Sequence, residues 1–273
     1  SFSFSIQFMC LIQKQLSYFF NSATESGAVK VGTLGNSFSI SLDTPILVPH
    51  SAKYATLHVP TAAVWNNSPN ISAVIGNNKL YFSYQGTGYV IDIADGLYSV
   101  SNMDTLFNSF FVNNALPEDL FSISSNDSTQ KILINFNYDD IIFDFTQADS
   151  CRDVLGFDSE TFGPFASPSV QPATNVASFN RVVSYFIRTT LLSAGIPQNK
   201  TSSGIISDIP IHAAVGSLIN HEPYHPIKSN VNELIGNPKQ TFTFTLLDQL
   251  QRDVSTMGEE FSLSIVINYY VEV

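Results

Sequence analysis

The 273-residue sequence predicts an all-β protein: a single jelly-roll β-sandwich with one main helix, long loops and an N-terminal arm. Most apolar runs alternate with polar residues at the period of a β-strand, and turn residues separate them. The chain also ends in its strongest strand, Phe261–Val271, in which Phe261, Leu263 and Ile265 share one face. A terminal strand this apolar has to lie between strands from much earlier in the chain, as in a sandwich closed by its terminus.

Composition narrows the class of protein. Only 13% of the residues are charged, against about 25% in typical proteins, and the chain has 22 Phe and 11 Tyr. Such a composition predicts a surface that is largely covered by other proteins. The net charge of −11, without any basic cluster, argues against direct contact with nucleic acid.

Two cysteines, Cys10 and Cys151, are too few for a disulfide framework. Residues 2–20 are interrupted by Gln and Lys, and they contain no run of 18 apolar residues. Neither a transmembrane segment nor a signal peptide is therefore expected.

The N-terminal 35 residues are predicted to form an arm and a linker. Phe2, Phe4, Ile6 and Phe8 alternate with polar residues, and residues 21–35 are small and polar. A strand-patterned arm on a soft linker is suited to adding onto the sheet edge of a neighbouring subunit. The alternative is that the arm is the first strand of the same domain, which is expected to cover residues 36–273.

Within this domain we expect strands at 37–42, 54–59, 79–84, 89–93, 120–123, 131–136, 141–145, 181–192, 205–212, 240–247 and 261–271. Pro60 is expected to end the second of these strands. Residues 101–115 predict the main helix, with Ser101 or Asn102 as its N-cap, and residues 147–155 predict a helical turn. Long loops at 65–78, 162–175 and 213–238 are candidates for contacts between subunits, with Trp65 and Tyr224 as contact residues.

The chemical motifs predict no enzyme, no cofactor and no metal site. The segment His221–His225 (HEPYH) has the letters of a zinc-protease motif, which requires a helix, but Pro223 lies inside it and Pro226 follows. Gly86 and Gly88 lie between two strand patterns, so they predict a hairpin turn rather than a phosphate-binding loop. The Asp residues between 139 and 158 lack the spacing of a calcium loop.

The order of several segments resembles that of penton and minor capsid proteins of virophages and Polinton-type elements, from about Asn36 to Val273. The segments that resemble this family in the first half are Asn36–Asp43 (NSFSISLD), Pro45–Pro49 (PILVP), Trp65–Ile71 (WNNSPNI), Asp95–Ser99 (DGLYS) and Leu155–Phe157 (LGF). Those in the second half are Ser184–Leu192 (SYFIRTTLL), Gly204–His212 (GIISDIPIH), Phe242–Asp248 (FTFTLLD) and Gly258–Ile265 (GEEFSLSI).

The resemblance implies a single jelly roll that assembles as a homopentamer at the fivefold vertices of an icosahedral virion, and a non-enzymatic, structural role. It also implies neighbouring major capsid capsomers, and other minor capsid proteins, as partners, and assembly in the host cytoplasm. One roll lacks the two tandem rolls of a major capsomer. The Pro-rich segment after Phe157 and the Phe-rich arm before Gly27 depart from the family pattern. They leave open whether the protein is the vertex penton or another minor capsid protein.

Two other functions remain open. A carbohydrate-binding jelly roll for receptor attachment would need an aromatic platform, for which Trp65, Tyr84, Tyr89 and Tyr224 are available. A cupin-like metalloenzyme would use His212, His221, Glu222 and His225.

Overall fold

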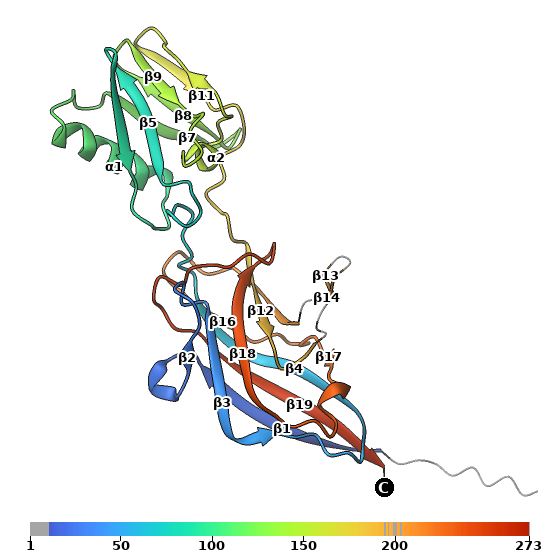
Figure 1. Cartoon of the computed structure of the whole chain (residues 1–273). Helices are drawn as coiled ribbons and strands as arrows, with labels where there is room; N and C mark the ends of the chain where they lie inside the picture. The colour runs from blue at the N-terminus through green and yellow to red at the C-terminus, as the bar shows by residue number, and fades with distance from the viewer. Residues whose placement is uncertain (1–10, 194, 196, 199–200, 203, 273) are drawn as a thin grey trace, which may run out of the picture. The chain divides into compact units, whose positions relative to one another are not determined.

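The computed structural model describes residues 11–272 except 194, 196, 199, 200 and 203. The described residues form two compact units (Figure 1). The roll unit contains the chain up to Ser68 and from Val182 onward, and the inserted unit is Pro69–Arg181. Each unit has its own hydrophobic core, and the two cores share no residue. One domain over residues 36–273 was expected; the structure has two units because residues 69–181 bury their apolar side chains among themselves.

The roll unit is built mainly of strands with four or more residues, which we call its long strands. They are β1 (Leu11–Asn21), β3 (Ser37–Ile46), β4 (Ala52–Trp65), β12 (Ser184–Thr189), β15 (Ile205–Pro210), β16 (Leu218–His221), β18 (Lys239–Asp248) and β19 (Ser262–Glu272). The shorter elements are η1 (Thr24–Ser26), β2 (Val29–Lys30), β13 (Pro197–Gln198), β14 (Thr201–Ser202), β17 (Ser229–Asn230) and η2 (Asn232–Leu234).

These strands form two antiparallel sheets that enclose one core. One sheet has the order β1-β19-β4-β16, with β17 also beside β4, and the other has the order β15-β12-β18-β3-β2. Among the eight long strands the first pairs with the last, the second with the seventh, the third with the sixth and the fourth with the fifth. This nested pairing is that of a jelly roll. The prediction of an all-β jelly-roll fold, closed by its terminal strand between early strands, is confirmed.

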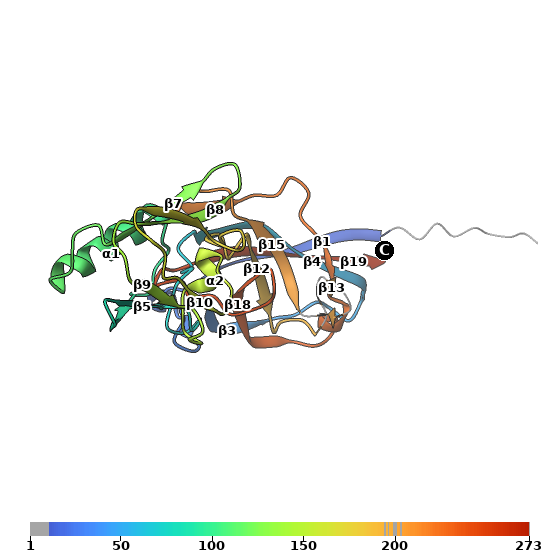
Figure 2. The same ribbon diagram turned by 90° about the horizontal axis from the view of Figure 1, so that it is seen from above.

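β1 corrects the predicted boundary of the arm. Its eleven residues pair with β19 without a bulge, from Leu11 opposite Glu272 to Asn21 opposite Ser262. Figure 2 shows these strands from above. Phe20 is buried, and Leu16 and Tyr18 pack against the roll core beside it. Residues 11–21 are therefore the first strand of the roll, because their apolar face completes its core. The predicted arm residues Phe2, Phe4, Ile6 and Phe8 lie outside the described residues.

β4 continues through Pro60, where the strand was expected to end. The register between β4 and β19 shifts there, so that Val59 and Pro60 lie opposite Ile265 alone. On its other side β4 pairs with β17 before this point and with β16 after it. Pro60 therefore lies at a bulge, where its lack of an N–H donor removes no hydrogen bond between strands.

The loop predicted at 213–238 contributes to the roll. Its residues Leu218–His221 form β16, which pairs with Ala62–Trp65 of β4. Four residues are too few to show a clear strand period, and pairing with β4 makes this segment a strand.

The inserted unit consists of two small sheets and two helices. One sheet orders β10 (Thr161–Phe162), β9 (Ile141–Asp144), β5 (Lys79–Tyr84) and β6 (Thr87–Asp92). The other orders β11 (Ser169–Pro172), β8 (Lys131–Phe136) and β7 (Phe121–Asn126). The helices are α1 (Val100–Asn113) and α2 (Arg152–Leu155). Phenylalanines dominate the core, with Phe107, Phe121 and Phe143 all buried.

Local predictions in this unit hold with small corrections. The N-cap of α1 is Ser99, whose side chain accepts a hydrogen bond from the Asn102 N–H in a capping box. β5 and β6 form the predicted hairpin, with Gln85 and Gly86 both at positive φ in a two-residue turn. The segment predicted as a long loop at 162–175 instead supplies edge strand β11 and packs Phe162 and Phe165 against the core.

Candidate functional site: the uncharged faces of the roll

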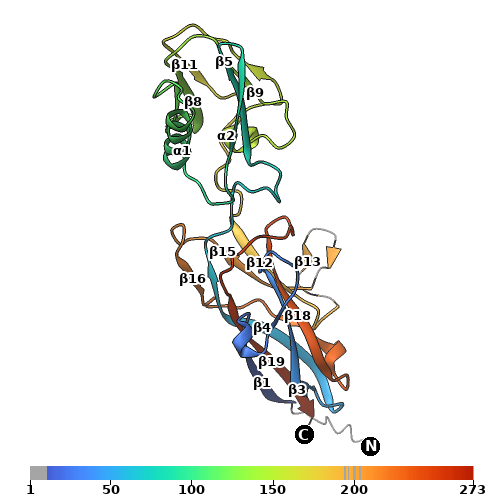
Figure 3. The same ribbon diagram turned by 60° about the vertical axis from the view of Figure 1, so that its left-hand side comes forward.

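The outer surface of β1, β19 and β4 is an uncharged sheet face, which we call the first face. Residues on these strands alternate between the core and this face, and the three strands lie side by side in Figure 3. In the centre of this face, four rows each contain one outward residue from each strand, and none of these residues is Asp, Glu, Lys or Arg. They are Gln13, Gln15, Ser17 and Phe19 of β1, Ser264, Val266, Asn268 and Tyr270 of β19, and Tyr54, Thr56, His58 and Thr61 of β4.

Side chains of the first face hydrogen-bond to one another. Gln13 Nε2 donates to Asn268 Oδ1 at 2.9 Å, and Tyr270 Oη donates to Gln13 Oε1 at 3.1 Å. The rings of Tyr54 and Tyr270 stack with centroids 4.2 Å apart. Phe19 is 67% exposed beside this ladder. Several polar groups of this face therefore already have partners, although the buried Nδ1 of His58 has none among the described residues, and Phe19 still offers an aromatic side chain.

The first face stays uncharged at neutral pH. Desolvation, with Lys228 as a smaller influence, lowers the pKa of His58 below its ordinary value. Desolvation and then the neighbouring Tyr270 raise the pKa of Tyr54. Both shifts favour the neutral forms. Beyond these rows, Lys53 and Glu272 form an ion pair of 2.6 Å where β19 ends.

The opposite sheet of the roll carries a second face, defined by the outward rows of β3 and β18. Ser37, Ser39 and Ser41 of β3 lie opposite Thr245, Thr243 and Thr241 of β18, in a ladder of hydroxyl groups. Hydroxyl contacts join the first and last of these pairs at 2.9 and 3.3 Å.

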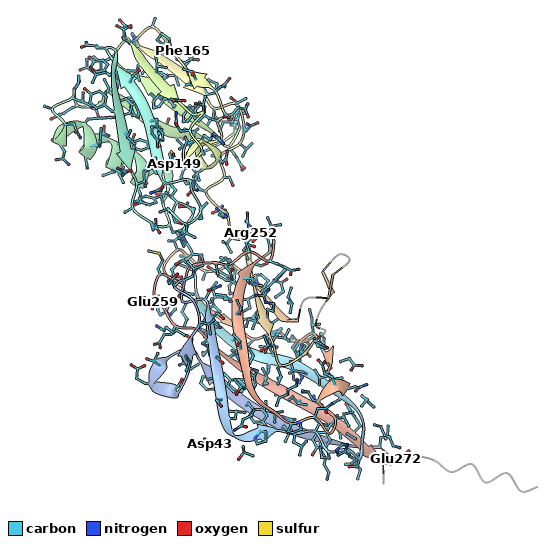
Figure 4. All side chains as sticks on the ribbon, viewed as in Figure 1. Asp43, Asp149, Phe165, Arg252, Glu259 and Glu272 are labelled. Carbon is cyan, nitrogen blue, oxygen red and sulfur yellow. The ribbon has the colours of Figure 1, made fainter. Side chains whose placement is uncertain are left out.

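The flank of the second face carries little charge. Val29 of β2 extends the Ser39 row and is 65% exposed. Arg188 of β12 pairs with Thr245. Among the described strands, it is the one charged residue that lies opposite an outward residue of β3 or β18. Of the charged residues labelled on the roll, Asp43 and Glu272 lie towards one end and Arg252 and Glu259 towards the other (Figure 4). This face was not predicted, although the alternation of hydroxyl and apolar residues in Ser37–Leu42 and Thr241–Leu246 contains its signal.

The two predicted contact residues lie in different settings. Trp65 is the last residue of β4, half-buried and opposite Leu218, and so belongs to a strand rather than to a loop. Tyr224 lies in the loop between β16 and β17 and is 91% exposed, with its ring against that of His225. Ile227 of the same loop is also exposed, as is Val215 just before β16. These residues on the two sides of β16 form a further apolar surface of the roll unit.

The residues considered for chemistry do not converge. His221 ends strand β16 and His225 lies in the following loop, so they do not share the face of a helix. Among the described residues, no three His, Cys, Asp or Glu side chains gather as metal ligands. Asp139 accepts a hydrogen bond from the Ser167 N–H, and Asp144 accepts hydrogen bonds from Thr146, as loop carboxylates commonly do.

The aromatic residues considered for carbohydrate binding are divided between the units. Tyr84 and Tyr89 belong to the inserted unit, where both pack against its core and Tyr89 stacks on Phe82. Trp65 and Tyr224 belong to the roll unit. The rings of Tyr84 and Tyr89 therefore serve packing within their unit.

Charge is distributed unequally between the units. Residues 69–181 contain 13 Asp or Glu and 4 Lys or Arg, whereas the rest of the chain contains 10 and 8. The acidic balance thus belongs to the inserted unit, and the roll unit is nearly neutral. A nearly neutral roll fits a surface that packs against other subunits, because like charges oppose association.

Comparison with known proteins shows similarity in structure rather than in sequence. No protein-family model and no curated protein matches the sequence. Among solved structures, the chain is similar to a selenomethionine-labelled mavirus penton protein, with a TM-score of 0.48 and 12% sequence identity. The alignment covers 96% of this chain and 100% of the mavirus chain. No helix among the described residues has the length and apolar character needed to cross a membrane.

Proposed function

We propose that the protein is a structural component of a viral capsid, a penton whose five copies close a ring at an icosahedral fivefold vertex. The observation that carries this proposal is the pair of uncharged faces on opposite sheets of one jelly roll. Isologous contacts close dimers, so a ring of five needs two different surfaces on each copy that fit one another. The first and second faces meet this requirement.

The chemistry of both faces suits burial between subunits. The cores of protein interfaces are depleted of charge and enriched in Tyr and Phe. Tyr54, Tyr270 and Phe19 on the first face would supply aromatic contacts, and the hydroxyl ladder of the second face would supply a flat surface. The bonded groups of these faces, such as Gln13 with Asn268 and Ser37 with Thr245, are already paired, so covering them costs less than burying unpaired donors.

The resemblance of the sequence to penton and minor capsid proteins supports the same proposal. In that role the protein would be part of the virion, assembled in the host cytoplasm, and would contact neighbouring major capsid capsomers. The exposed residues Tyr224, Ile227 and Val215, on the two sides of β16, are our candidate for the contact with neighbouring capsomers, since they lie outside both faces.

The first test is the mass of the purified protein in solution, measured by sedimentation and mass photometry. We expect a species of five copies of the 30.0 kDa chain. A monomer at every concentration would overturn the proposal. A different closed oligomer would support another minor capsid role in place of the vertex penton.

A pair of variants tests the use of both faces. Phe19→Lys places a charge on the first face and Thr243→Lys places one on the second, and each is expected to abolish the ring. A 1:1 mixture should form dimers only, because the intact second face of one variant still meets the intact first face of the other. Val74→Lys, at a 72% exposed position of the inserted unit, is the control and should leave the ring intact. A mixture that stays monomeric would contradict a contact between unlike faces.

A further inference from the structure

We propose that the outer edge of β1 binds residues Phe2–Phe8 of a second copy of this chain as an added β-strand. This inference rests on the proposed assembly and names what the N-terminal segment binds within it. Among the described residues, β19 is the only strand that pairs with β1. The other edge of β1 is therefore a row of backbone groups without a strand partner, which is the usual template for strand addition.

The edge of β1 lacks the common protections against pairing. Natural edge strands are short, bulged, or carry Pro and several charges. β1 has eleven residues in unbroken register with β19, contains no Pro, and carries one charged residue, Lys14. An edge this long and this weakly protected is suited to a partner strand.

The side chains along this edge match the N-terminal segment. Leu16 and Tyr18 point to the core side of β1 and remain half-buried at the sheet margin, while Gln13, Gln15 and Ser17 lie on the outer face. Phe2, Phe4, Ile6 and Phe8 alternate with Ser3, Ser5 and Gln7. An added strand would thus cover Leu16 and Tyr18 with apolar side chains and extend the polar outer face with Ser and Gln.

The sequence favours a partner chain over self-pairing. To pair with its own β1, the segment would have to reverse direction in a tight turn, which usually contains Gly, Asn, Asp or Pro. Residues 1–20 contain none of these four residue types. In a ring, the segment of one copy is held close to the next copy, and this high effective concentration favours pairing between copies.

The test uses the full-length protein with a photoreactive phenylalanine analogue in place of Phe4. We expect a covalent link between two copies, and peptide mapping should place it within Leu11–Phe20 of the second copy. The same analogue at Val74 is the control and should give no link to β1. A link confined to one copy, or one that maps elsewhere on the partner, would overturn the inference.

A backbone variant separates strand pairing from simple apolar contact. Ser5→Pro keeps every apolar side chain of the segment but removes an N–H, and it should lower the yield of the link by about tenfold or more, since Pro is excluded from paired strand interiors. Ser1→Pro lies outside the predicted strand and should leave the yield unchanged. Equal yields for the two variants would contradict strand addition.

The outcomes distinguish this inference from the proposed function. A ring that forms without any link between residue 4 and β1 overturns only the strand addition. A chain that stays monomeric and gives no link between copies overturns both.

Discussion

Cys151 shows how one buried side chain depends on the core of the inserted unit. It is the N-cap residue of α2, is fully buried, and donates its N–H to the Lys79 carbonyl at 2.8 Å. Burial raises the pKa of the Cys151 thiol to about 12. The thiolate is the reactive form of cysteine, so folding should make this residue inert.

The first prediction concerns the reactivity of Cys151. In a Cys10→Ser background at pH 8, the folded protein should react with iodoacetamide about 10³-fold more slowly than an ordinary thiol, from the difference in thiolate fraction alone. Reaction at the ordinary rate should return in urea. Rapid labelling of the folded protein would show that Cys151 is accessible.

The same pKa fixes a dependence of stability on pH. The thiol pKa is higher in the folded state than in the unfolded state, so the stabilisation is constant below the unfolded value of 9.0 and declines between pH 9 and about 12. Between pH 8 and pH 10 the free energy of unfolding of the inserted unit should fall by about 1.4 kcal/mol through this group. Urea titrations that compare the wild type with Cys151→Ala isolate the effect, because the variant lacks this thiol.

At the scale of elements, β1 demonstrates that adjacent residues of one type can have opposite roles. Phe20 is 5% exposed and its ring lies 5.4 and 5.1 Å from those of Phe242 and Phe244, across the core. Phe19 points outward beside Ser264. β1 therefore packs one face against the roll core and contributes its other face to the first face.

The second prediction compares these two phenylalanines. Phe20→Ala should lower the free energy of unfolding of the roll unit by about 3 kcal/mol, through lost burial and the resulting cavity. Phe19→Ala should change it by less than about 0.5 kcal/mol. The measurement is urea unfolding followed by the fluorescence of Trp65, which is the single tryptophan and belongs to the roll unit. Equal effects would mean that β1 is not an integral strand of the roll.

At the scale of the whole molecule, the chain carries a second unit between the third and fourth long strands of the roll. Where the chain passes from one unit to the other, the hydrogen bonds stay within each unit. Asn70 Nδ2 donates to the Phe179 carbonyl at 3.0 Å in the inserted unit. The hydroxyl groups of Ser68 and Tyr185 lie 2.9 Å apart in the roll unit. Asn70 is buried and also bonds to Tyr98 in both directions. The ends of the inserted unit are therefore held close together inside it.

The third prediction is that residues 69–181 fold in isolation. Their hydrophobic core and the hydrogen bonds that Asn70 makes at the start of the unit lie entirely within this range. Domains whose termini lie close together tolerate excision. The isolated fragment should give a dispersed amide NMR spectrum and a cooperative urea transition. Asn70→Ala should lower its free energy of unfolding by about 2 kcal/mol, since it leaves buried backbone groups unpaired, and Asn180→Ala, at an exposed position, serves as the control. An unfolded fragment would show that the unit depends on the roll.

The sequence by itself determined the strand class, most strand positions and the closing role of the last strand, because side-chain alternation is a local signal set by the geometry of one strand. The same signal contained both uncharged faces, in the Gln and Ser of β1 and the Ser and Thr of β3 and β18. It could not give the division into two cores, the strand character of β16, or the passage of β4 through Pro60. Those depend on pairing between residues far apart in the chain: Leu218 becomes a strand residue only opposite Trp65, and Pro60 is tolerated only because the register with β19 shifts beside it. Only the tertiary structure decided these features, because such pairing adds hydrogen bonds and burial that no local pattern records.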